Sequence, residues 1–457
     1  MTTPADTIVA VATPFGEGAI ALLRLSGPEA LTIADQVCVL PGGKSVSALR
    51  PKRLTRATML TTKSSVLDHI LVAVYRAPVS YTGEDVVEFT CHGGILLTRR
   101  ALESLLAAGA RAAGPGEFTQ RAFLHGKMEL TQAEAVMDLI SAGTDLALRA
   151  AAEQLEGRLG QRVLGLREDV LSLVAHVEAY IDFPDEDIDP DTGAALLARF
   201  EAVWSGLDAL LATAGQGRIL REGVRTVIYG EPNVGKSSLL NALLGSERAI
   251  VSAVPGTTRD TVEEFVNVRG LPLRLIDTAG LRDTADAVEA IGIERTRQTL
   301  ARADLALRVF DASLPRPADA ALPAPAPAAV ELRVLNKADL GVHPSWQDLP
   351  SAPPGVRVSC VTSEGLETLA NAIYERVTSG QVAWNPSAAA INARHQDCLR
   401  RARAGIEAAR EALQAGRSPE FVALDLRLTL DALGEVVGGV DAEDILGRIF
   451  STFCIGK

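Results

Sequence analysis

The sequence predicts a multidomain protein with α/β and α parts. An N-terminal α+β domain is followed by a helical domain, and an α/β module is inserted between the two halves of that helical domain. Three observations lead to this prediction. The length of 457 residues fits about three domains at ~150 residues each. Short apolar runs separated by Gly and Pro turns fill residues 6–125, whereas helical periodicity dominates residues 130–220 and returns after about residue 387. The pattern between the two helical stretches changes again, which indicates the insertion.

The first predicted domain, an α+β domain, spans residues 1–125. Apolar runs predict strands at 7–12, 19–25, 69–75 and 86–90, and helical patterns predict helices at 28–37 and 95–107. These residues include 12 Lys/Arg and 10 Asp/Glu, so they carry a formal charge of +2 in a chain whose net charge is −12. The acidic balance of the chain argues against whole-surface attraction to nucleic acid.

The helical domain is predicted in two halves, residues 126–220 and 381–457. Ala, Leu, Glu and Arg dominate the first half, which has few Gly and almost no Pro. We expect one break in it, at residues 182–187. Its acids are interpreted as an exposed turn between antiparallel helices, because they lack the spacing of a calcium loop. In the second half the helical pattern runs from about Ser387 to about Phe450.

The inserted module, residues 221–380, begins with the run GEPNVGKSS from Gly230 to Ser238. This run fits the P-loop pattern, in which backbone N–H groups cradle phosphates. Lys236 would reach the β and γ oxygens, and a helix expected from about Ser237 would point its N-terminal dipole at the anion. Ser237 and Thr258 offer hydroxyls for Mg²⁺, a hard cation that prefers oxygen ligands. Taken alone, the run indicates only a nucleotide or a Gly-rich surface turn.

Three later segments indicate that the nucleotide is a guanine nucleotide: the turn Gly256–Thr258, Asp277–Gly280 and Asn336–Asp339. Asp277–Gly280 follows an apolar strand, where a P-loop NTPase needs a carboxylate near Mg²⁺ and an N–H for the γ-phosphate. In Asn336–Asp339, the final carboxylate can accept two parallel N–H bonds from guanine that adenine cannot supply. Val358–Cys360 lies where a base-contacting loop usually follows. The ordered set predicts a Ras-like P-loop G domain, with Pro315–Ala328 as an enlarged surface loop.

Two positions depart from a Ras-like pattern. Leu281 stands where Ras-like proteins have a water-orienting Gln, and Leu cannot hydrogen-bond water. An acid from the following segment must take that role, and the candidates are Asp283, Asp286, Glu289 and Glu294. The side-chain carbonyl of Asn233, within the P-loop, could coordinate a monovalent cation beside the phosphates. A local turn hydrogen bond is the alternative for Asn233.

Composition excludes several other classes of protein. No apolar stretch reaches transmembrane length, and residues 1–6 lack the basic and apolar pattern of a signal peptide, so we expect a soluble, cytoplasmic protein without membrane partners. The five cysteines are scattered, odd in number and without a CxxC pair. This spacing supports neither a zinc site nor a disulfide framework.

Several further runs make the chain similar to the MnmE (also called TrmE) family, bacterial tRNA-modification GTPases with mitochondrial relatives. The resemblance covers essentially the whole length. The runs are Asp6–Ala10, Ser80–Asp85, His92–Gly94, Pro115–Thr119, Arg121–Leu124, Leu130–Ala135 and Cys454–Lys457. The resemblance implies an N-terminal folate-binding and dimerisation domain, a split helical domain and an inserted G domain.

The resemblance also implies an activity and its partners. It implies a homodimer that joins an FAD-dependent partner, MnmG (also called GidA), in a heterotetramer, and a potassium-dependent GTP hydrolysis with Mg²⁺. Together the partners would place an aminomethyl or carboxymethylaminomethyl group on carbon 5 of the tRNA wobble uridine, with a tetrahydrofolate derivative supplying the bridging carbon. The acidic balance of this chain indicates that tRNA is held largely by the partner or by local basic patches.

Residue by residue, the resemblance implies several sets of site residues. A folate, whose glutamate tail and pterin suit charged partners, would contact Arg24, Glu88, Lys127 and Lys457. A potassium ion would be held by Asn233, Ser252, Val254 and Thr257. Glu289 corresponds to the water-orienting acid, and Arg259 belongs to the switch loop. GTP would contact Asn233, Val234, Gly235, Lys236, Ser237, Ser238, Ser252, Ala253, Val254, Pro255, Gly256, Thr257, Thr258, Asp277, Thr278, Ala279, Gly280, Asn336, Lys337, Ala338, Asp339, Ser359 and Cys360.

Cys454 is a candidate catalytic residue with Glu289 and Arg259, but its role stays open. It is either a nucleophile activated by the nearby Lys457, or a small apolar residue that packs the tail and positions the substrate, the role we favour.

The function of the whole chain has alternatives too. A regulatory GTPase switch on RNA or the ribosome is disfavoured by the N-terminal runs and the CIGK tail. A folate enzyme with a vestigial nucleotide module is disfavoured by the intact Lys236, Ser237, Asp277 and Asp339.

Overall fold

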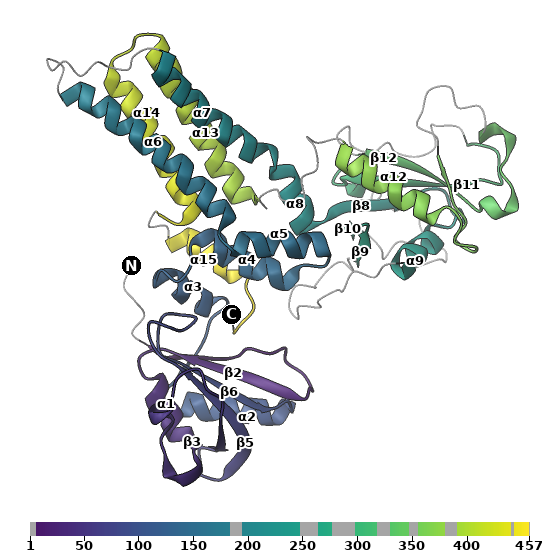
Figure 1. The fold of residues 1–457 in the computed structure, drawn as a ribbon. Helices are drawn as coiled ribbons and strands as arrows, with labels where there is room; N and C mark the ends of the chain where they lie inside the picture. Colours follow the sequence, from purple (N-terminus) through teal and green to yellow (C-terminus); the bar gives the residue numbers. More distant parts are fainter. Residues whose placement is uncertain are drawn as a thin grey trace. The chain divides into compact units, whose positions relative to one another are not determined.

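The computed structural model describes residues 6–182, 194–246, 264–276, 298–317, 330–346, 355–379, 391–439 and 443–456. The chain divides into two compact units (Figure 1). Unit 1 comprises residues 1–137 and 437–457, and unit 2 comprises residues 138–436. Among the described helices, none is both long and apolar enough to cross a bilayer.

Unit 1 is built on a seven-stranded sheet with the order β3-β4-β5-β6-β2-β1-β7. Neighbouring strands are antiparallel except for β1 and β7, which pair in parallel. The strands are β1 (Ile8–Val11), β2 (Ile20–Ser26), β3 (Cys38–Val39), β4 (Thr55–Leu60), β5 (Val66–Tyr75), β6 (Val86–His92) and β7 (Arg111–Ala112). The four predicted strands correspond to β1, β2, β5 and β6 and are confirmed. β3, β4 and β7 were not predicted; β3 and β7 are too short for alternation to be visible.

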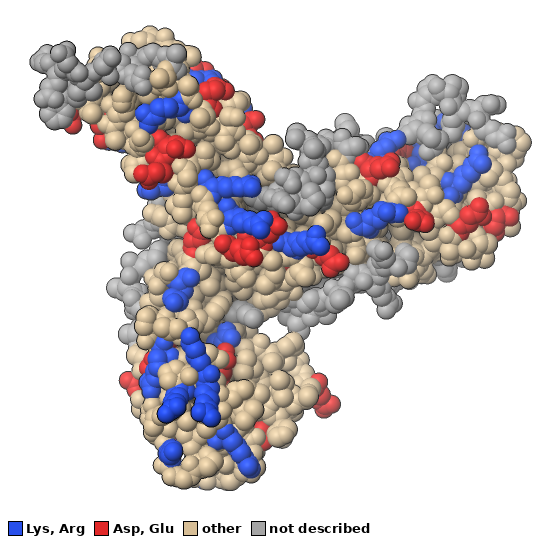
Figure 2. Space-filling model, in the orientation of Figure 1, with Lys and Arg blue, Asp and Glu red and all other residues tan. Residues whose placement is uncertain are grey.

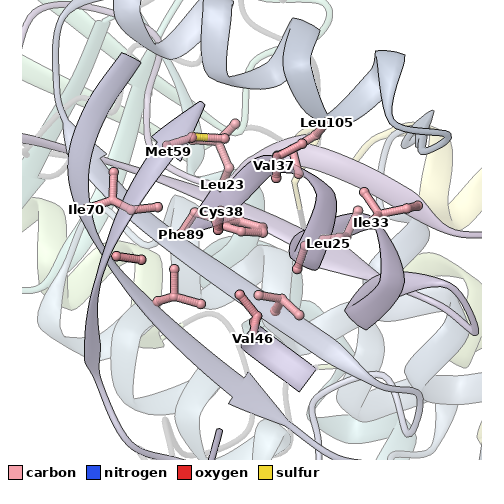
Figure 3. Close-up of a cluster of buried hydrophobic side chains, with 14 of the residues drawn as sticks. Leu23, Leu25, Ile33, Val37, Cys38, Val46, Met59, Ile70, Phe89 and Leu105 are labelled. Atoms are coloured by element: carbon pink, nitrogen blue, oxygen red, sulfur yellow. The ribbon is translucent and has the colours of Figure 1, made fainter. Parts of the chain in front are cut away.

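Two helices cover one face of this sheet and form its core. They are α1 (Ala30–Val37) and α2 (Ile95–Ala107), at the positions predicted from helical periodicity. Figure 3 shows side chains from β2, β5 and β6 meeting those of the helices; among them are Leu23, Leu25, Ile70, Phe89, Ile33, Val37 and Leu105. Each large apolar side chain buried in this way contributes roughly 1.5–3 kcal/mol.

The C-terminal end of the chain belongs to the same unit as the N-terminal sheet. Helix α15 (Glu443–Ser451) packs near α3 (Glu117–Leu124). Phe450 and Phe453 stack with ring centroids 5.3 Å apart. Ile455 then forms an antiparallel bridge with Pro115. The last described residues are thereby held against a segment more than 300 residues earlier in the chain.

The helices of unit 2 come from both sides of the inserted module. They are α5 (Asp145–Leu155), α6 (Arg158–Asp182), α7 (Ala194–Ala212), α8 (Ala214–Glu222), α13 (Ala393–Gln414) and α14 (Pro419–Val437), while α4 (Leu130–Ser141) lies across the division between the units. Arg410 of α13 pairs with Glu201 of α7 at 2.7 Å, and Arg427 of α14 pairs with Glu178 of α6 at 2.6 Å. Contacts between the two sequence halves therefore hold the helical part together (Figure 1).

The prediction of a single break in the first helical stretch is wrong. The chain also leaves helical geometry between α4 and α5, between α5 and α6, and between α7 and α8. At the first of these breaks Thr144 caps α5, since its hydroxyl accepts a hydrogen bond from Ala147 N at 3.2 Å. Such a cap starts a new helix without any proline. The predicted acidic turn at 182–187 lies outside the described residues apart from its first one.

The second sheet, in unit 2, has six strands in the order β13-β12-β11-β8-β10-β9. All its pairings are parallel except that between β9 and β10. The strands are β8 (Val224–Tyr229), β9 (Glu264–Val268), β10 (Leu271–Leu275), β11 (Leu305–Asp311), β12 (Val330–Asn336) and β13 (Val356–Arg357). Helices α9 (Lys236–Ser246) and α12 (Leu366–Ser379) pack on it in one apolar cluster. This mixed sheet and the helices around it confirm the predicted fold class.

Candidate functional site

The predicted P-loop connects the carboxyl end of β8 to the first turn of α9. Two parallel strands, β10 and β11, flank β8, so the loop leaves the middle of the sheet. Gly235, with φ +95°, precedes the helix; a Cβ there would lie 2.1 Å from Nδ2 of Asn336. Only glycine fits this close approach and this backbone conformation.

Lys236 turns its ammonium group back onto the loop that precedes it. Nζ donates to the carbonyl oxygens of Gly230, at 3.1 Å, and Glu231, at 2.7 Å. Burial lowers the pKa of Lys236. The loop thus encloses a positive charge next to the N-terminus of α9, whose unpaired N–H groups favour an anion.

Asn233 lies on the exposed side of the same loop. Its backbone is left-handed, with φ +63°, a conformation that Asn adopts more readily than most residues. Its side chain makes no hydrogen bond with any residue that the structure describes. The local turn hydrogen bond considered as the alternative role is therefore not formed among these residues.

Asn336, at the end of β12, joins three of the predicted segments. It is 2% exposed. Its Nδ2 donates to the carbonyl of Val234 in the P-loop at 2.9 Å, and its Oδ1 accepts from Cys360 N at 3.4 Å. One buried amide therefore fixes the P-loop and the 358–360 loop at the same edge of the sheet.

The neighbouring residues of the 336–339 segment stand at that edge as well. Lys337 pairs with Asp311, the last residue of β11, at 2.6 Å. Asp339 is exposed in a short 3₁₀ turn. Burial raises the pKa of Cys360, and the nearby Asp339 carboxylate raises it further. The structure thus brings Asp339 and Cys360 close together, with the carboxylate open to solvent.

Sequence reasoning missed Asp311. Its register partner on β12 is Asn336, so it ends the adjacent parallel strand. The sequence feature that could have revealed Asp311 is an acid directly after the largely apolar run 305–310, because the carboxyl ends of parallel strands meet at one edge of the sheet.

Among the other predicted residues, Ser237 and Ser238 lie on the first turn of α9. Ser359 is buried, and its hydroxyl accepts from Thr362 N at 3.1 Å.

Many predicted residues lie outside the described part of the chain. They are Ser252, Ala253, Val254, Pro255, Gly256, Thr257, Thr258, Arg259, Asp277, Thr278, Ala279, Gly280, Leu281, Glu289 and Lys457. In the described residues, no group of three or more His, Cys, Asp and Glu side chains could hold a metal ion.

A second candidate site lies in unit 1, where Arg24 and Glu88 face each other across β2 and β6. Nε and Nη2 of Arg24 both donate to Oε1 of Glu88, at 2.9 and 2.8 Å. Tyr75 OH donates to Oε2 at 3.3 Å. The guanidinium lies over the rings of Tyr81, at 5.2 Å, and Phe118, at 5.8 Å. The charged pair therefore lies beside two aromatic rings. The sequence analysis did not predict these two aromatic residues as part of the site.

Lys127 does not touch this pair. It is exposed, and its Nζ donates to the carbonyl of Pro78 at 2.9 Å. Pro78 lies in the loop of residues 76–85, which also carries Tyr81, so this loop connects Lys127 to the surroundings of Arg24. The structure brings Arg24 and Glu88 together and leaves Lys127 exposed, with its ammonium group on the Pro78 carbonyl.

The C-terminal tail lies next to the strands of this second site. The carbonyl of Cys454 accepts from Gly116 N at 3.4 Å, and Cys454 is half-buried. Gly456 has φ +102°, and a Cβ there would lie 2.5 Å from the carbonyl oxygen of Val11. The neighbour of Val11 in β1, Ala10, pairs with Arg24. The tail therefore reaches the strand pair that carries the candidate arginine.

Four of the runs that are similar to the family's motifs meet in one ion network. Buried Arg121 donates to Asp6 Oδ1 at 2.7 Å, to Glu84 Oε1 at 3.1 Å and to Glu117 Oε1 at 3.0 Å. Arg111 pairs with Asp6 and Glu117, both at 2.6 Å. The hydrogen bond from Arg111 is the largest cause that lowers the pKa of Asp6, while burial opposes it. These residues hold the N-terminal segment in place. The sequence analysis identifies their runs as motifs similar to those of the family, but it does not predict the ion network.

Comparison with known proteins gives matches along the whole chain. A family model described as the MnmE helical domain matches residues 130–454, and one described as the GTP-binding protein TrmE N-terminus matches residues 7–127. A protein from Akkermansia muciniphila named tRNA modification GTPase MnmE is 53% identical over 458 residues, which cover 100% of both chains. A protein of the same name from Bacillus subtilis is 44% identical over 99% of this chain and 100% of its own. Among solved structures, the G domain of the T. maritima FeoB iron transporter is 26% identical over 34% of this chain and 98% of its own, with a TM-score of 0.23.

Proposed function

Since the chain belongs to the MnmE family and is therefore a tRNA modification GTPase, we propose that it serves the modification of the tRNA wobble uridine. In this proposal a homodimer of the chain works with an FAD-dependent, MnmG-like partner in a heterotetramer. Together they install an aminomethyl or carboxymethylaminomethyl group at carbon 5, with a one-carbon unit from a tetrahydrofolate derivative. The observation that best supports a guanine-nucleotide site is the buried Asn336 amide, which ties the P-loop to the 358–360 loop.

Deleting the gene and measuring wobble uridines by mass spectrometry tests this proposal. We expect the C5-substituted uridines to disappear, to return with the wild-type gene and to stay absent with Lys236→Ala, which removes the ammonium group from the P-loop. Unchanged uridines in the deletion strain would refute the proposed function.

Lys236, Asp339, Ser237 and Thr258 receive separate roles in the proposed nucleotide site; Thr258 lies outside the described residues. Lys236 exchanges its contacts with two backbone carbonyls for phosphate oxygens, which offer stronger, charge-assisted bonds. Asp339, exposed beside Cys360, accepts the N–H groups of guanine. Ser237 and Thr258 are the proposed ligands of Mg²⁺, which supplies positive charge to the phosphates when bound.

Water activation is assigned to Glu289, with Arg259 in the switch loop; both lie outside the described residues. Leu281 has no polar atom on its side chain, so an acid from the following segment must orient the water. Glu289→Ala should slow turnover by about 10²-fold or more and leave GDP affinity nearly unchanged. An unaltered kcat would transfer the role to Asp283, Asp286 or Glu294.

The folate site is proposed at Arg24, Glu88, Lys127 and Lys457. Arg24 and Glu88 are only 14% and 19% exposed and neutralise each other. Nη1 of Arg24 makes no hydrogen bond with any described residue, so it keeps a free donor for a carboxylate. The rings of Tyr81 and Phe118 beside it suit a flat heterocycle.

Cys454 is proposed to act in this second site, because its tail is docked beside the strand pair that carries Arg24. Positioning the substrate remains the role we favour. Cys454→Ser and Cys454→Ala separate the two roles of the thiol. If Ala keeps modification and Ser loses it, the site needs an apolar group; if both lose it with folate affinity intact, chemistry at sulfur is the better account.

A further inference from the structure

Residues 36–67 of unit 1, called the basic segment here, contain six basic side chains and no acidic one. All six side chains are exposed: Lys44, Arg50, Lys52, Arg53, Arg56 and Lys63. The chain as a whole has a net charge of −12, so the positive charge of this stretch is opposite in sign to that of the chain. In Figure 2, Lys and Arg side chains gather over the part of unit 1 that carries α1 and β3 in Figure 1.

The six cations of the basic segment have no ion-pair partner among the described residues, unlike every other arginine of residues 6–125. Those other six each have a carboxylate partner at 3.4 Å or less; they are Arg24, Arg76, Arg99, Arg100, Arg111 and Arg121. The basic segment makes no ion pair with any residue in the described part of the chain. Its charges are therefore available to an external anion.

The backbone of the basic segment is held in place. Lys52 N donates to the carbonyl of Val74 at 2.8 Å, and Ser47 N donates to Asp35 Oδ1 at 3.0 Å. Arg56 is on β4, in register with Leu71 of β5. The four cations from Arg50 to Arg56 span at most about 20 Å. A double-stranded nucleic acid presents a phosphate charge about every 1.7 Å along its axis, so this length faces several phosphates.

The composition of the basic segment indicates the kind of contact it makes. It has no Phe, Trp or Tyr on which an unpaired base could stack. Phosphate contacts fix the position and orientation of a nucleic acid without reading its sequence. We propose that the basic segment binds the phosphate backbone of a helical stem of the tRNA substrate and so positions it, an inference that rests on the proposed function.

The test compares two variants with the same change of charge. Lys52→Gln/Arg53→Gln removes two cations that have no ion-pair partner among the described residues. Arg99→Gln/Arg100→Gln removes two that pair with Glu103 elsewhere in unit 1. Binding of an unmodified tRNA transcript to the full-length protein is measured by fluorescence anisotropy over a series of KCl concentrations. A duplex RNA and a single-stranded RNA of equal length serve as competitors.

We expect the first variant to bind about 10- to 50-fold more weakly at 0.1 M salt, with a log–log salt slope smaller by about 1.5, because two phosphate contacts are lost. The second variant should bind like wild type, the duplex should compete better than the single strand, and GTP hydrolysis without RNA should be unchanged in both variants. Equal affinities and slopes for the two variants would overturn the proposal.

Failure of this inference differs from failure of the proposed function. Both variants are also introduced into the deletion strain, and wobble uridines are measured. If the wild-type gene does not restore modification, the proposed function fails. If Lys52→Gln/Arg53→Gln binds tRNA normally but loses modification, the basic segment serves an acidic protein partner and the RNA proposal is overturned.

Discussion

Asn336 illustrates how much a single side chain determines in the nucleotide site. Its amide is almost fully buried and binds the P-loop on one side and the 358–360 loop on the other. A buried amide that loses one partner leaves the other group unsatisfied, at a cost of about 1–3 kcal/mol. The geometry of the loop therefore depends on a residue about 100 positions later in the chain.

Potassium dependence is the first prediction at the scale of a residue. Asn233 is exposed on the P-loop, with a side chain that is free of hydrogen bonds to described residues. We expect faster GTP hydrolysis in potassium than in sodium at equal ionic strength, since a cation there neutralises charge between the β and γ phosphates. Asn233→Ala should remove the difference. Equal wild-type rates in the two salts would contradict the assignment.

Asp304 supports a second residue-scale prediction, on pH dependence. Burial raises the pKa of this carboxyl, but hydrogen bonds from Arg225 and Arg218 outweigh burial and lower it to about 2. A folded-state pKa below the unfolded value stabilises the fold above about pH 4, and this contribution is lost as the pH falls towards 2. Asp304→Asn should therefore lower the free energy of unfolding by about 2 kcal/mol at pH 7, an amount that shrinks towards pH 2.

Urea unfolding of the wild type and of Asp304→Asn at several pH values measures this difference. Asp397→Asn is the matched control. Its carboxylate is 71% exposed in an i,i+4 pair with Arg401, so it should change stability by about 0.5 kcal/mol or less. A difference for Asp304→Asn that does not vary with pH would rule out the linkage.

At the scale of elements, short segments are held in place by contacts with helices and strands that are distant in the sequence. The segment before β1, the 80–85 loop and α3 are joined by the Arg121 network. The C-terminal tail is joined to the start of α3 and to the end of β1 by backbone contacts. Backbone docking of this kind depends on conformation, so a single methyl group at the contact can disturb it.

The tail gives the prediction at this scale. Gly456→Ala adds a Cβ that would lie 2.5 Å from the Val11 carbonyl, in a left-handed conformation. We expect the tail to undock, tRNA modification to fall sharply and GTP hydrolysis to persist. Gly447→Ala is the control, because its Cβ meets nothing within 4 Å and it lies within α15. Normal modification by Gly456→Ala would mean that the docked tail is not required.

At the scale of the whole molecule, the two candidate sites belong to different units. Arg24 and Glu88 lie in unit 1, and the P-loop and Asn336 lie in unit 2. Each unit has its own sheet and its own apolar core. The domain limits of 125, 220 and 380 stay predictions.

Separate units predict that the two sites can be mutated separately. Arg24→Ala should weaken binding of a formylated tetrahydrofolate by about 1.5–3 kcal/mol, the value of one charge-assisted contact, while basal GTP hydrolysis survives. Calorimetry with Arg99→Ala as control measures the first effect, since Arg99 is exposed and ion-paired in the same unit. Unchanged folate affinity in Arg24→Ala would refute the folate assignment.

Much of this protein was determined by its local sequence. The P-loop run, the 336–339 segment and the periodicity of β1, β2, α1 and α2 were visible because their physics is local: backbone conformation, helix dipoles and alternation act within a few residues. The unpaired basic segment is visible in the sequence too, as a stretch without acids. Only the structure, however, shows that its cations make no ion pair with any described residue.

The tertiary structure decided what lies next to what. It paired Arg24 with Glu88 across two strands, placed Asp311 beside Asn336, and brought Glu178 to Arg427 from 249 residues away. It also docked the tail beside β1. Such contacts join segments that are distant along the chain, and their energies depend on burial and register that no local pattern contains. Motif chemistry could therefore be predicted from the sequence alone, whereas the partners of each charged group came only from the fold.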